Sequence, residues 1–260
     1  MKIFLLILSI VFLNCCGNKN SNSDKANLSR KIIDTNKKAT TEFKTENPYA
    51  AKSNAKQNFK KLTDTTVVLN FKNLSNVYNY RITDKYYCNR NQYHGDSVYR
   101  VIKIFNKNDS LIQRIYPNLQ MVPWYFFEND MPSALSRSYV TGKNVNADVT
   151  DNYCGEIVVA DLNFDGLEDF ATPVDHGCDN GAHYAFYIQN SNDQFKRNTY
   201  LTENVTWFPE EINDSLLMFT NSVPLMWGIA CQTFKYDTLS KKWGKTKDYV
   251  IDYRTGKIIR

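Results

Sequence analysis

The sequence predicts an all-β protein whose short strands pair mainly antiparallel in one domain. From residue 65 onward the apolar segments are short, rich in β-branched and aromatic residues, and separated by turns of Asn, Asp, Gly and Lys. The chain contains 17 Tyr and 15 Phe, and aromatic side chains suit pleated, half-buried strands. No long segment with the helical period of about 3.6 residues follows residue 65.

Ten segments have the length and composition of strands. They are residues 67–71, 78–83, 99–105, 111–115, 156–160, 170–174, 184–188, 215–220, 231–236 and 249–253. The quartets NKND at 106–109 and NSND at 190–193 are typical of tight turns and predict hairpins at those places. One short helix is expected at residues 132–137. No internal repeat of fixed period is visible, which disfavours a full propeller.

Residues 1–15 are predicted to be a lipoprotein-type signal peptide. A positively charged start precedes the apolar run 3–13, which is too short to cross a bilayer as a helix of about 20 residues. A cysteine directly after such a run resembles the lipobox of bacterial lipoproteins. Cys15 is therefore the expected lipid acceptor, with Cys16 as the alternative, and an ordinary secreted protein is the second alternative. The expected location is the bacterial cell envelope, lipid-anchored and facing the periplasm or the outer surface.

Residues 16–64 are predicted to be a polar tether, and residues 65–260 the folded β domain. The tether is rich in Asn, Lys, Ser and Thr and nearly free of large apolar residues, so it cannot bury enough surface to offset the entropy of ordering. Apolar residues at helical spacing after Asn47 and Pro48 indicate one short helix leading into the domain.

Charge and motif content exclude several functional classes. The formal net charge is only +5, and no dense Lys/Arg block is interleaved with aromatic residues, so a nucleic-acid-binding protein is not expected. The sequence lacks a G-x-S-x-G, an H-E-x-x-H and a phosphate-binding loop. A non-enzymatic protein is therefore predicted, and a hydrolase that uses paired carboxylates ranks third among the alternatives.

The stretch DLNFDGLED carries oxygen ligands at the spacing of a calcium loop. Positions 1, 3, 5, 7 and 9 are Asp161, Asn163, Asp165, Leu167 (through its carbonyl) and Asp169, with Gly166 at the sharp turn. Ca²⁺ prefers about six to eight oxygen ligands. Position 12 is Thr172 instead of an acid, and both flanks read as strands, so this is no EF-hand. We predict one structural Ca²⁺, with a solvated polar turn as the alternative.

Four cysteines beyond the first two predict two disulfides in an exported protein. If the strands around the calcium loop pair with Ala160 near Phe170, Cys154 lies close to Cys178, which leaves Cys88 for Cys231. This arrangement places the ion and the Cys154–Cys178 disulfide at opposite ends of a hairpin, about 17 Å apart. The loop at the disulfide end, residues 175–183, is read as a partner-contact loop. A zinc or Cys–His site and a plain hairpin connection are its alternatives.

Residues 158–195 resemble two groups of known proteins. The D-x-N-x-D-G-x-x-D pattern between strands is similar to the calcium loops of FG-GAP repeats in integrins. The longer segment, with its Gly/Asn loop, aromatic strand and Asn/Asp turn, resembles bacterial envelope lipoproteins typified by the xanthomonad immunity protein against a secreted lysozyme-like effector. A vaguer similarity continues into YRTGK at residues 253–257.

The second resemblance implies a mostly β, calcium-binding inhibitor of a peptidoglycan glycosidase that inserts a loop into the enzyme's cleft. By position it assigns the calcium ligands to Asp161, Asn163, Asp165, Leu167 and Asp169. It assigns the partner contact to Asn180, Gly181, His183 and Tyr184, with Asn180 standing where the family often has Ser. The expected function is a calcium-stabilised lipoprotein that binds a lysozyme-like hydrolase; the alternative is a carbohydrate- or surface-binding module.

Overall fold

The structure is a computed structural model, and it describes residues 64–88, 97–123, 126, 135–147, 152–175 and 181–259. The predicted signal peptide with Cys15, the tether up to residue 63 and the expected helix after Asn47 lie outside the described residues. The chain divides into two units, Met1–Lys56 and Gln57–Arg260, and the described residues all belong to the second. Everything below concerns the second unit.

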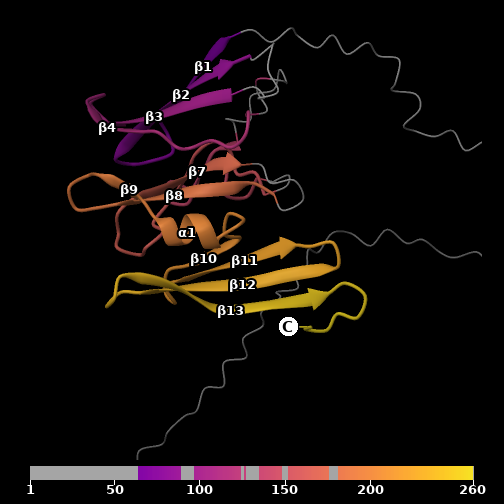
Figure 1. Cartoon of the computed structure of the whole chain (residues 1–260). Helices are drawn as coiled ribbons and strands as arrows, with labels where there is room; N and C mark the ends of the chain where they lie inside the picture. Colours follow the sequence, from indigo (N-terminus) through magenta and orange to yellow (C-terminus); the bar gives the residue numbers. More distant parts are fainter. Residues whose placement is uncertain are drawn as a thin grey trace, which may run out of the picture. The chain divides into compact units, whose positions relative to one another are not determined.

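The prediction of an all-β fold is confirmed: three sheets follow one another along the chain (Figure 1). The N-terminal sheet contains β1 (Thr65–Phe71), β2 (Tyr78–Tyr87), β3 (Ser97–Asn106) and β4 (Leu111–Ile115). The middle sheet contains β5 (Arg137–Ser138), β6 (Val158–Ala160), β7 (Asp169–Asp175), β8 (His183–Gln189) and β9 (Phe195–Arg197). The C-terminal sheet contains β10 (Glu211–Asn213), β11 (Met218–Pro224), β12 (Gly228–Asp237) and β13 (Lys242–Asp252). Within each sheet the spatial order of the strands is their order in the chain.

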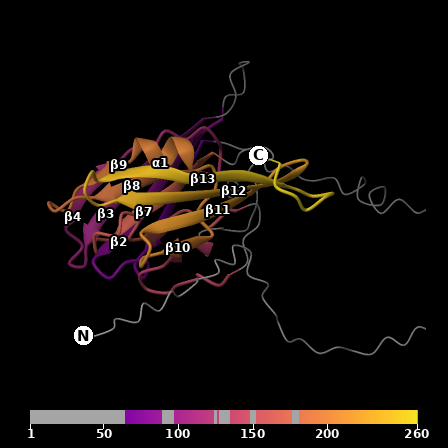
Figure 2. The same cartoon turned by 90° about the horizontal axis from the view of Figure 1, so that it is seen from below.

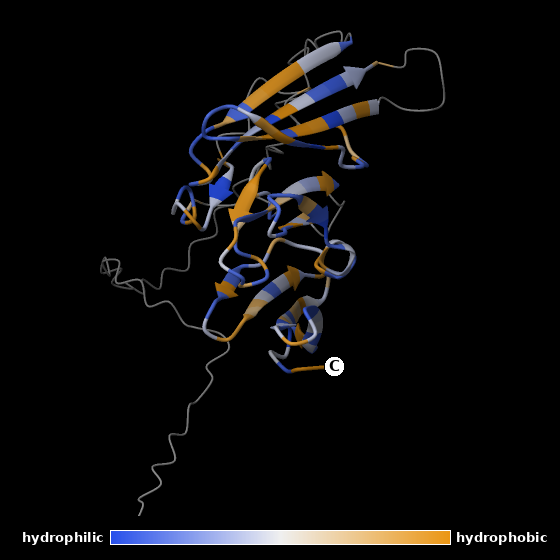
Figure 3. Ribbon diagram, turned by 90° about the vertical axis from the view of Figure 1, so that its left-hand side faces the viewer, coloured by the Kyte–Doolittle hydropathy of each residue, from blue (hydrophilic) through white to orange (hydrophobic). Residues whose placement is uncertain are grey.

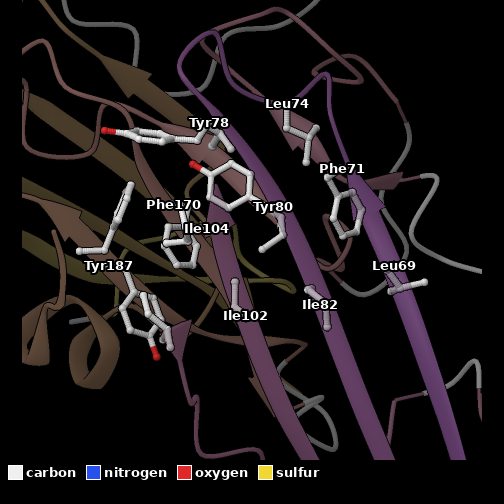
Figure 4. Close-up of a cluster of buried hydrophobic side chains, with 14 of the residues drawn as sticks. Leu69, Phe71, Leu74, Tyr78, Tyr80, Ile82, Ile102, Ile104, Phe170 and Tyr187 are labelled. Atoms are coloured by element: carbon white, nitrogen blue, oxygen red, sulfur yellow. The ribbon is translucent and has the colours of Figure 1, made fainter. Parts of the chain in front are cut away.

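The middle sheet is buried on both faces, so the three sheets form three layers. Figure 2, seen from below, shows the C-terminal sheet in front of the middle sheet, with the N-terminal sheet behind it. One core cluster joins Phe170 and Tyr187 of the middle sheet to Tyr80 and Ile104 of the N-terminal sheet (Figure 4), and it also contains Val159 of β6. A second cluster covers the opposite face, and it joins the middle sheet to the C-terminal sheet. Its members include Val158, Ala171, Phe186, Leu201, Phe208, Phe219, Phe234 and Trp243.

The outer sheets bury one face only, as their sequences predict. Along β2 buried residues alternate with half-buried or exposed ones, and Figure 3 shows apolar and polar residues alternating along the strands of the upper, N-terminal sheet. This period of two is the signature of a strand with one face in a core. By contrast, β6 is buried at every residue, which matches a strand with a layer on each side.

Three local predictions are wrong. Arg137, expected in a helix, lies in β5, which pairs parallel with β6 through Arg137 and Val158; residues 132–134 lie outside the described residues. The helix that is present, α1 (Thr199–Asn204), was not predicted, and it begins where the Asn198 side chain accepts a hydrogen bond from Leu201 N. The strand expected at residues 215–220 begins only at Met218, in β11, because residues 214–217 form the turn between β10 and β11.

Within the described ranges no helix combines the length and the apolar composition that crossing a membrane requires.

Gly155 occupies a place where a side chain does not fit. Its φ is +88°, and a Cβ there would lie 2.2 Å from Ser136 N and 2.5 Å from Ser136 Cα. We expect Gly155→Ala to lower the free energy of unfolding by about 2–3 kcal/mol, through the left-handed backbone and the overlap together. Gly142→Ala is the matched control, because Gly142 has φ +74° with no atom within 4 Å; it should cost only about 1 kcal/mol. Equal losses for both variants in urea unfolding would contradict the steric argument.

Candidate metal centre

The predicted calcium loop connects two adjacent antiparallel strands of the middle sheet, β6 and β7. Ala160 pairs with Asp169 and Val159 with Phe170, so Ala160 lies near Phe170 as predicted, in the neighbouring pair of the ladder. The ladder contains three pairs and ends at Val158 and Ala171. Asp161 therefore follows directly after β6, and Asp169 is the first residue of β7.

The loop is folded by hydrogen bonds from its own backbone to its carboxylates. Asp161 Oδ1 accepts from Asp165 N (3.1 Å) and its Oδ2 accepts from Gly166 N (2.8 Å). Leu167 N donates to Asp165 Oδ1 (2.9 Å), and Leu162 N donates to Asp169 Oδ2 (2.9 Å). These bonds fix the path of the loop between the predicted ligands.

Two residues with positive φ make the tight curve feasible. Gly166 has φ +83°, which glycine adopts at little energetic cost. Phe164 has φ +59°, an unusual value for a bulky residue. Its ring packs on Trp243 of β13, with the ring centroids 5.9 Å apart. That contact with the C-terminal sheet offsets the backbone strain at Phe164.

The carboxylates of the loop lie in an environment that disfavours their negative charge. Burial raises the pKa of Asp161, and the nearby Asp165 carboxylate adds to the rise. Burial also raises the pKa of Asp169 well above its ordinary value, with further contributions from Asp165 and Asp161. Both shifts are opposed by the backbone N–H groups that bond these carboxylates. A bound cation would favour the charged forms.

Asn163 supplies an independent sign that an ion fits this loop. Its side chain is only 8% exposed, and Oδ1 is buried with no hydrogen-bond partner, whereas Nδ2 donates to Asp165 Oδ2 (2.8 Å). A buried, unpartnered carbonyl oxygen is unfavourable unless something binds it. Among the described residues, no three His, Cys, Asp or Glu side chains are grouped as around a metal. The fit therefore depends on the amide of Asn163 and the carbonyl of Leu167 together with the carboxylates.

The loop also touches all three layers of the fold. Glu168 accepts hydrogen bonds from the Ser75 hydroxyl and from Asn76 N (3.0 Å), both in the connection between β1 and β2. Asp169 Oδ1 accepts from Gln189 N (2.7 Å) at the end of β8. With Phe164 on Trp243, one loop thus links the N-terminal, middle and C-terminal sheets. Glu168 was not singled out from the sequence, because position 8 of a calcium loop carries no ligand.

No protein-family model, curated protein or solved structure matches this chain. The resemblance to envelope lipoproteins stays a prediction, and the roles of individual residues are argued below from their contacts.

The predicted partner-contact loop is only partly exposed. Tyr184 is 0% exposed, and its hydroxyl accepts from Cys154 N (2.7 Å) and donates to Asn152 O (3.3 Å). A contact role for Tyr184 is therefore wrong, because its ring belongs to the core against Phe208. Gly181 is also buried. His183 is half-buried, and Asn180 lies outside the described residues.

The described residues contain no disulfide. Cys88 and Cys231 are not bonded to each other, so the predicted bond between them is absent. The reason is their placement: Cys88 follows β2 and packs against the first core cluster, whereas Cys231 lies in β12 of the C-terminal sheet. Cys154 is buried in the second cluster. Its partner Cys178 lies outside the described residues, so that pairing stays a prediction.

A buried ionic cluster, which the sequence did not reveal, joins the N-terminal sheet to the middle sheet. Arg100 of β3 is 1% exposed, and its Nη2 lies 2.7 Å from Asp84 Oδ2 and 2.5 Å from Glu156 Oε2. Nη1 donates to the Thr172 hydroxyl (3.2 Å) on β7. The Tyr153 hydroxyl also donates to Glu156. These groups pair with one another in the interior, which indicates a structural cluster.

Proposed function

We propose that this chain is a calcium-stabilised, non-enzymatic binding protein of the bacterial cell envelope. The observation that carries the proposal is the loop from Asp161 to Asp169, which combines oxygen donors, a buried unpartnered Asn163 Oδ1 and contacts to all three sheets. The proposed ligands are the side chains of Asp161, Asn163, Asp165 and Asp169 and the carbonyl of Leu167.

The ion would act on stability and not on chemistry. A catalytic metal keeps an open position beside a pocket and an acid or base. Here the loop's own residues would fill most of the coordination sphere, and two of its other side chains, Phe164 and Glu168, are engaged in contacts with neighbouring sheets. A cation would neutralise the buried carboxylates and hold the three layers together through this loop. The contacts of the loop therefore favour a structural ion over one that acts as a Lewis acid.

The proposed partner is a lysozyme-like peptidoglycan hydrolase, and the proposed location is a lipid anchor at Cys15 in the envelope. The support is the resemblance of residues 158–195 to envelope lipoproteins of that kind. Because Tyr184 and Gly181 are buried, the contact would rest on His183 and on the neighbouring Asn180.

A panel of lysozyme-type enzymes tests this partner. The purified protein should inhibit at least one of them with a 1:1 stoichiometry, and Asn180→Ala combined with His183→Ala should weaken inhibition about tenfold, as expected for a central contact. Trp227→Ala is the control, since this exposed residue lies on the C-terminal sheet beyond β11. If no enzyme of the panel is bound or inhibited, the hydrolase partner is rejected. The calcium proposal is tested separately, by the effect of a chelator on the melting temperature.

One observation favours a carbohydrate-binding module as the second candidate. Tyr99 and Tyr116 of the N-terminal sheet are 49% and 56% exposed, and their ring centroids lie 6.0 Å apart. An exposed pair of aromatic rings offers an apolar surface with polar edges, which suits the face of a sugar ring.

A further inference from the structure

The outward-facing strand positions of the N-terminal sheet carry one sign of charge; an acid, Asp109, lies in the turn between β3 and β4 and accepts a hydrogen bond from Asn79. The residues between the core positions of β2, β3 and β4 point away from the first core cluster. The outward-facing cations are Arg81, Lys85, Lys103 and Arg114. The outward positions of β1 to β4 include no Asp or Glu among the residues that the structure describes. The positive charge of this face is therefore not balanced within the sheet.

Three of these cations stand in a single row across three strands. Arg81 of β2 pairs with Lys103 of β3, and Lys103 pairs with Arg114 of β4. Neighbouring strands are about 4.8 Å apart, and like charges directly opposite one another on a sheet are destabilising. None of the three forms an ion pair with another described residue. A row of like charges without a paired acid suits the binding of an external anion.

The side chain of Arg81 is held in position. Its Nε donates to Asn70 Oδ1 (2.8 Å), and its guanidinium carbon lies 5.1 Å from the centre of the Phe105 ring. Arg81 is exposed, and its described hydrogen bond uses Nε and not the outer guanidinium nitrogens. This arrangement suits an anionic group, which arginine binds with two parallel hydrogen bonds.

The aromatic pair lies on the same face as the row of cations. Tyr99 is on β3 with Lys103, and Tyr116 follows Arg114 by two residues. Two residues along a strand span about 7 Å. A flat chain lying across the sheet can thus meet the aromatic pair and the row of cations together.

We propose that this face binds an anionic polysaccharide, with Arg81, Lys103 and Arg114 contacting its acidic groups and Tyr99 and Tyr116 stacking on its sugar rings. The inference rests on the second candidate function and names the class of carbohydrate. Nucleic acid fits less well, because duplex-binding proteins commonly neutralise about 6–10 phosphates, more than the four outward cations supply.

Matched ligands and matched variants test the proposal on the full chain. The probes are polygalacturonate, its fully methyl-esterified neutral form, polyphosphate and a single-stranded oligonucleotide, measured by calorimetry at one salt concentration. The first variant combines Arg81→Gln, Lys103→Gln and Arg114→Gln. The control combines Lys235→Gln, Lys242→Gln and Lys247→Gln, three exposed residues of the C-terminal sheet with the same total charge.

We expect polygalacturonate to bind, the first variant to bind it about tenfold more weakly, and the control to stay within about twofold. Tyr99→Ala with Tyr116→Ala should weaken binding of polygalacturonate and leave that of polyphosphate unchanged. The first variant should unfold at the same or a higher urea concentration, because it removes repulsion, so any lost binding is not lost folding.

Several outcomes would overturn the proposal. An equal loss of polygalacturonate binding in the first variant and in the control would show a general effect of net charge, without a site on this face. Oligonucleotide or polyphosphate binding as tight as that of polygalacturonate would exclude a glycan as the ligand. Binding of the neutral ester that the first variant does not affect would reject the anionic class and keep the carbohydrate module. If no glycan binds, both the anionic-polysaccharide site and the carbohydrate-binding module are rejected.

Discussion

Arg100→Met is expected to lower the free energy of unfolding by about 3–5 kcal/mol. The substitution keeps an unbranched side chain of similar length but removes the guanidinium that faces both Asp84 and Glu156. The two carboxylates then remain in the interior without their cation, and an uncompensated buried charge is strongly unfavourable. Urea unfolding followed by tryptophan fluorescence measures the loss.

The control for this prediction is Arg114→Met on the adjacent strand. Arg114 is exposed, so the same change of residue should alter stability by less than about 1 kcal/mol. Adding Asp84→Asn and Glu156→Gln to Arg100→Met should recover part of the lost stability, because no buried charge then lacks a counter-ion. A similar loss for Arg114→Met, or no recovery in the triple variant, would argue against an electrostatic cause.

Calcium is expected to raise the free energy of unfolding by about 4 kcal/mol at a thousandfold excess over its dissociation constant. The proposed ligands Asp161, Asn163, Asp165 and Asp169 belong to a loop whose conformation depends on the folded middle sheet, so calcium should bind the native state in preference to the unfolded chain. Adding a chelator should therefore lower the melting temperature of the wild type, and Asp165→Ala should abolish that response.

Asp214→Ala provides the matched control for calcium. Asp214 is an exposed acid in the turn between β10 and β11, so its loss changes the net charge by the same amount as Asp165→Ala. The chelator should still lower its melting temperature as in the wild type. If the chelator does not change the melting temperature of the wild type, or lowers that of Asp165→Ala by as much as that of the wild type, the loop is excluded as the calcium site.

The fold class could be predicted because the pattern that indicates a strand depends only on residues that are neighbours in the chain. The alternation in β2 and the Asn/Asp turns at 106–109 and 190–193 depend on neighbouring residues only. Helix α1 was missed because six residues are too few for a helical period to show. The parallel pairing of β5 with β6 was missed because it depends on a contact between segments that are distant in the chain.

For the candidate site too, features that depend on local sequence could be predicted, and features that depend on contacts between distant segments could not. The ligand pattern from Asp161 to Asp169 is local, so it could be read directly, and the surrounding contacts could not. Tyr184 was read as a contact residue because a Tyr beside Gly and His looks exposed in sequence. Its burial follows from the layer that packs over the second face of the middle sheet. Arg100 was missed although the alternation in RVIKIF places it in phase with the inward Ile102 and Ile104, because arginine is rarely buried unless paired and its partner Glu156 is distant in the chain.

The chain order of the strands within the sheets bears on how the protein folds. Every hydrogen-bonded strand pair in the three sheets joins consecutive strands, and only the β5–β6 pair is parallel. The entropy lost in closing a connection grows with its length, and predominantly local pairing favours fast folding for a β protein. A chain that emerges N-terminus first, from a ribosome or an export channel, can complete each meander before the next one appears. Docking of the preformed layers on the two apolar faces of the middle sheet would then be the slow step.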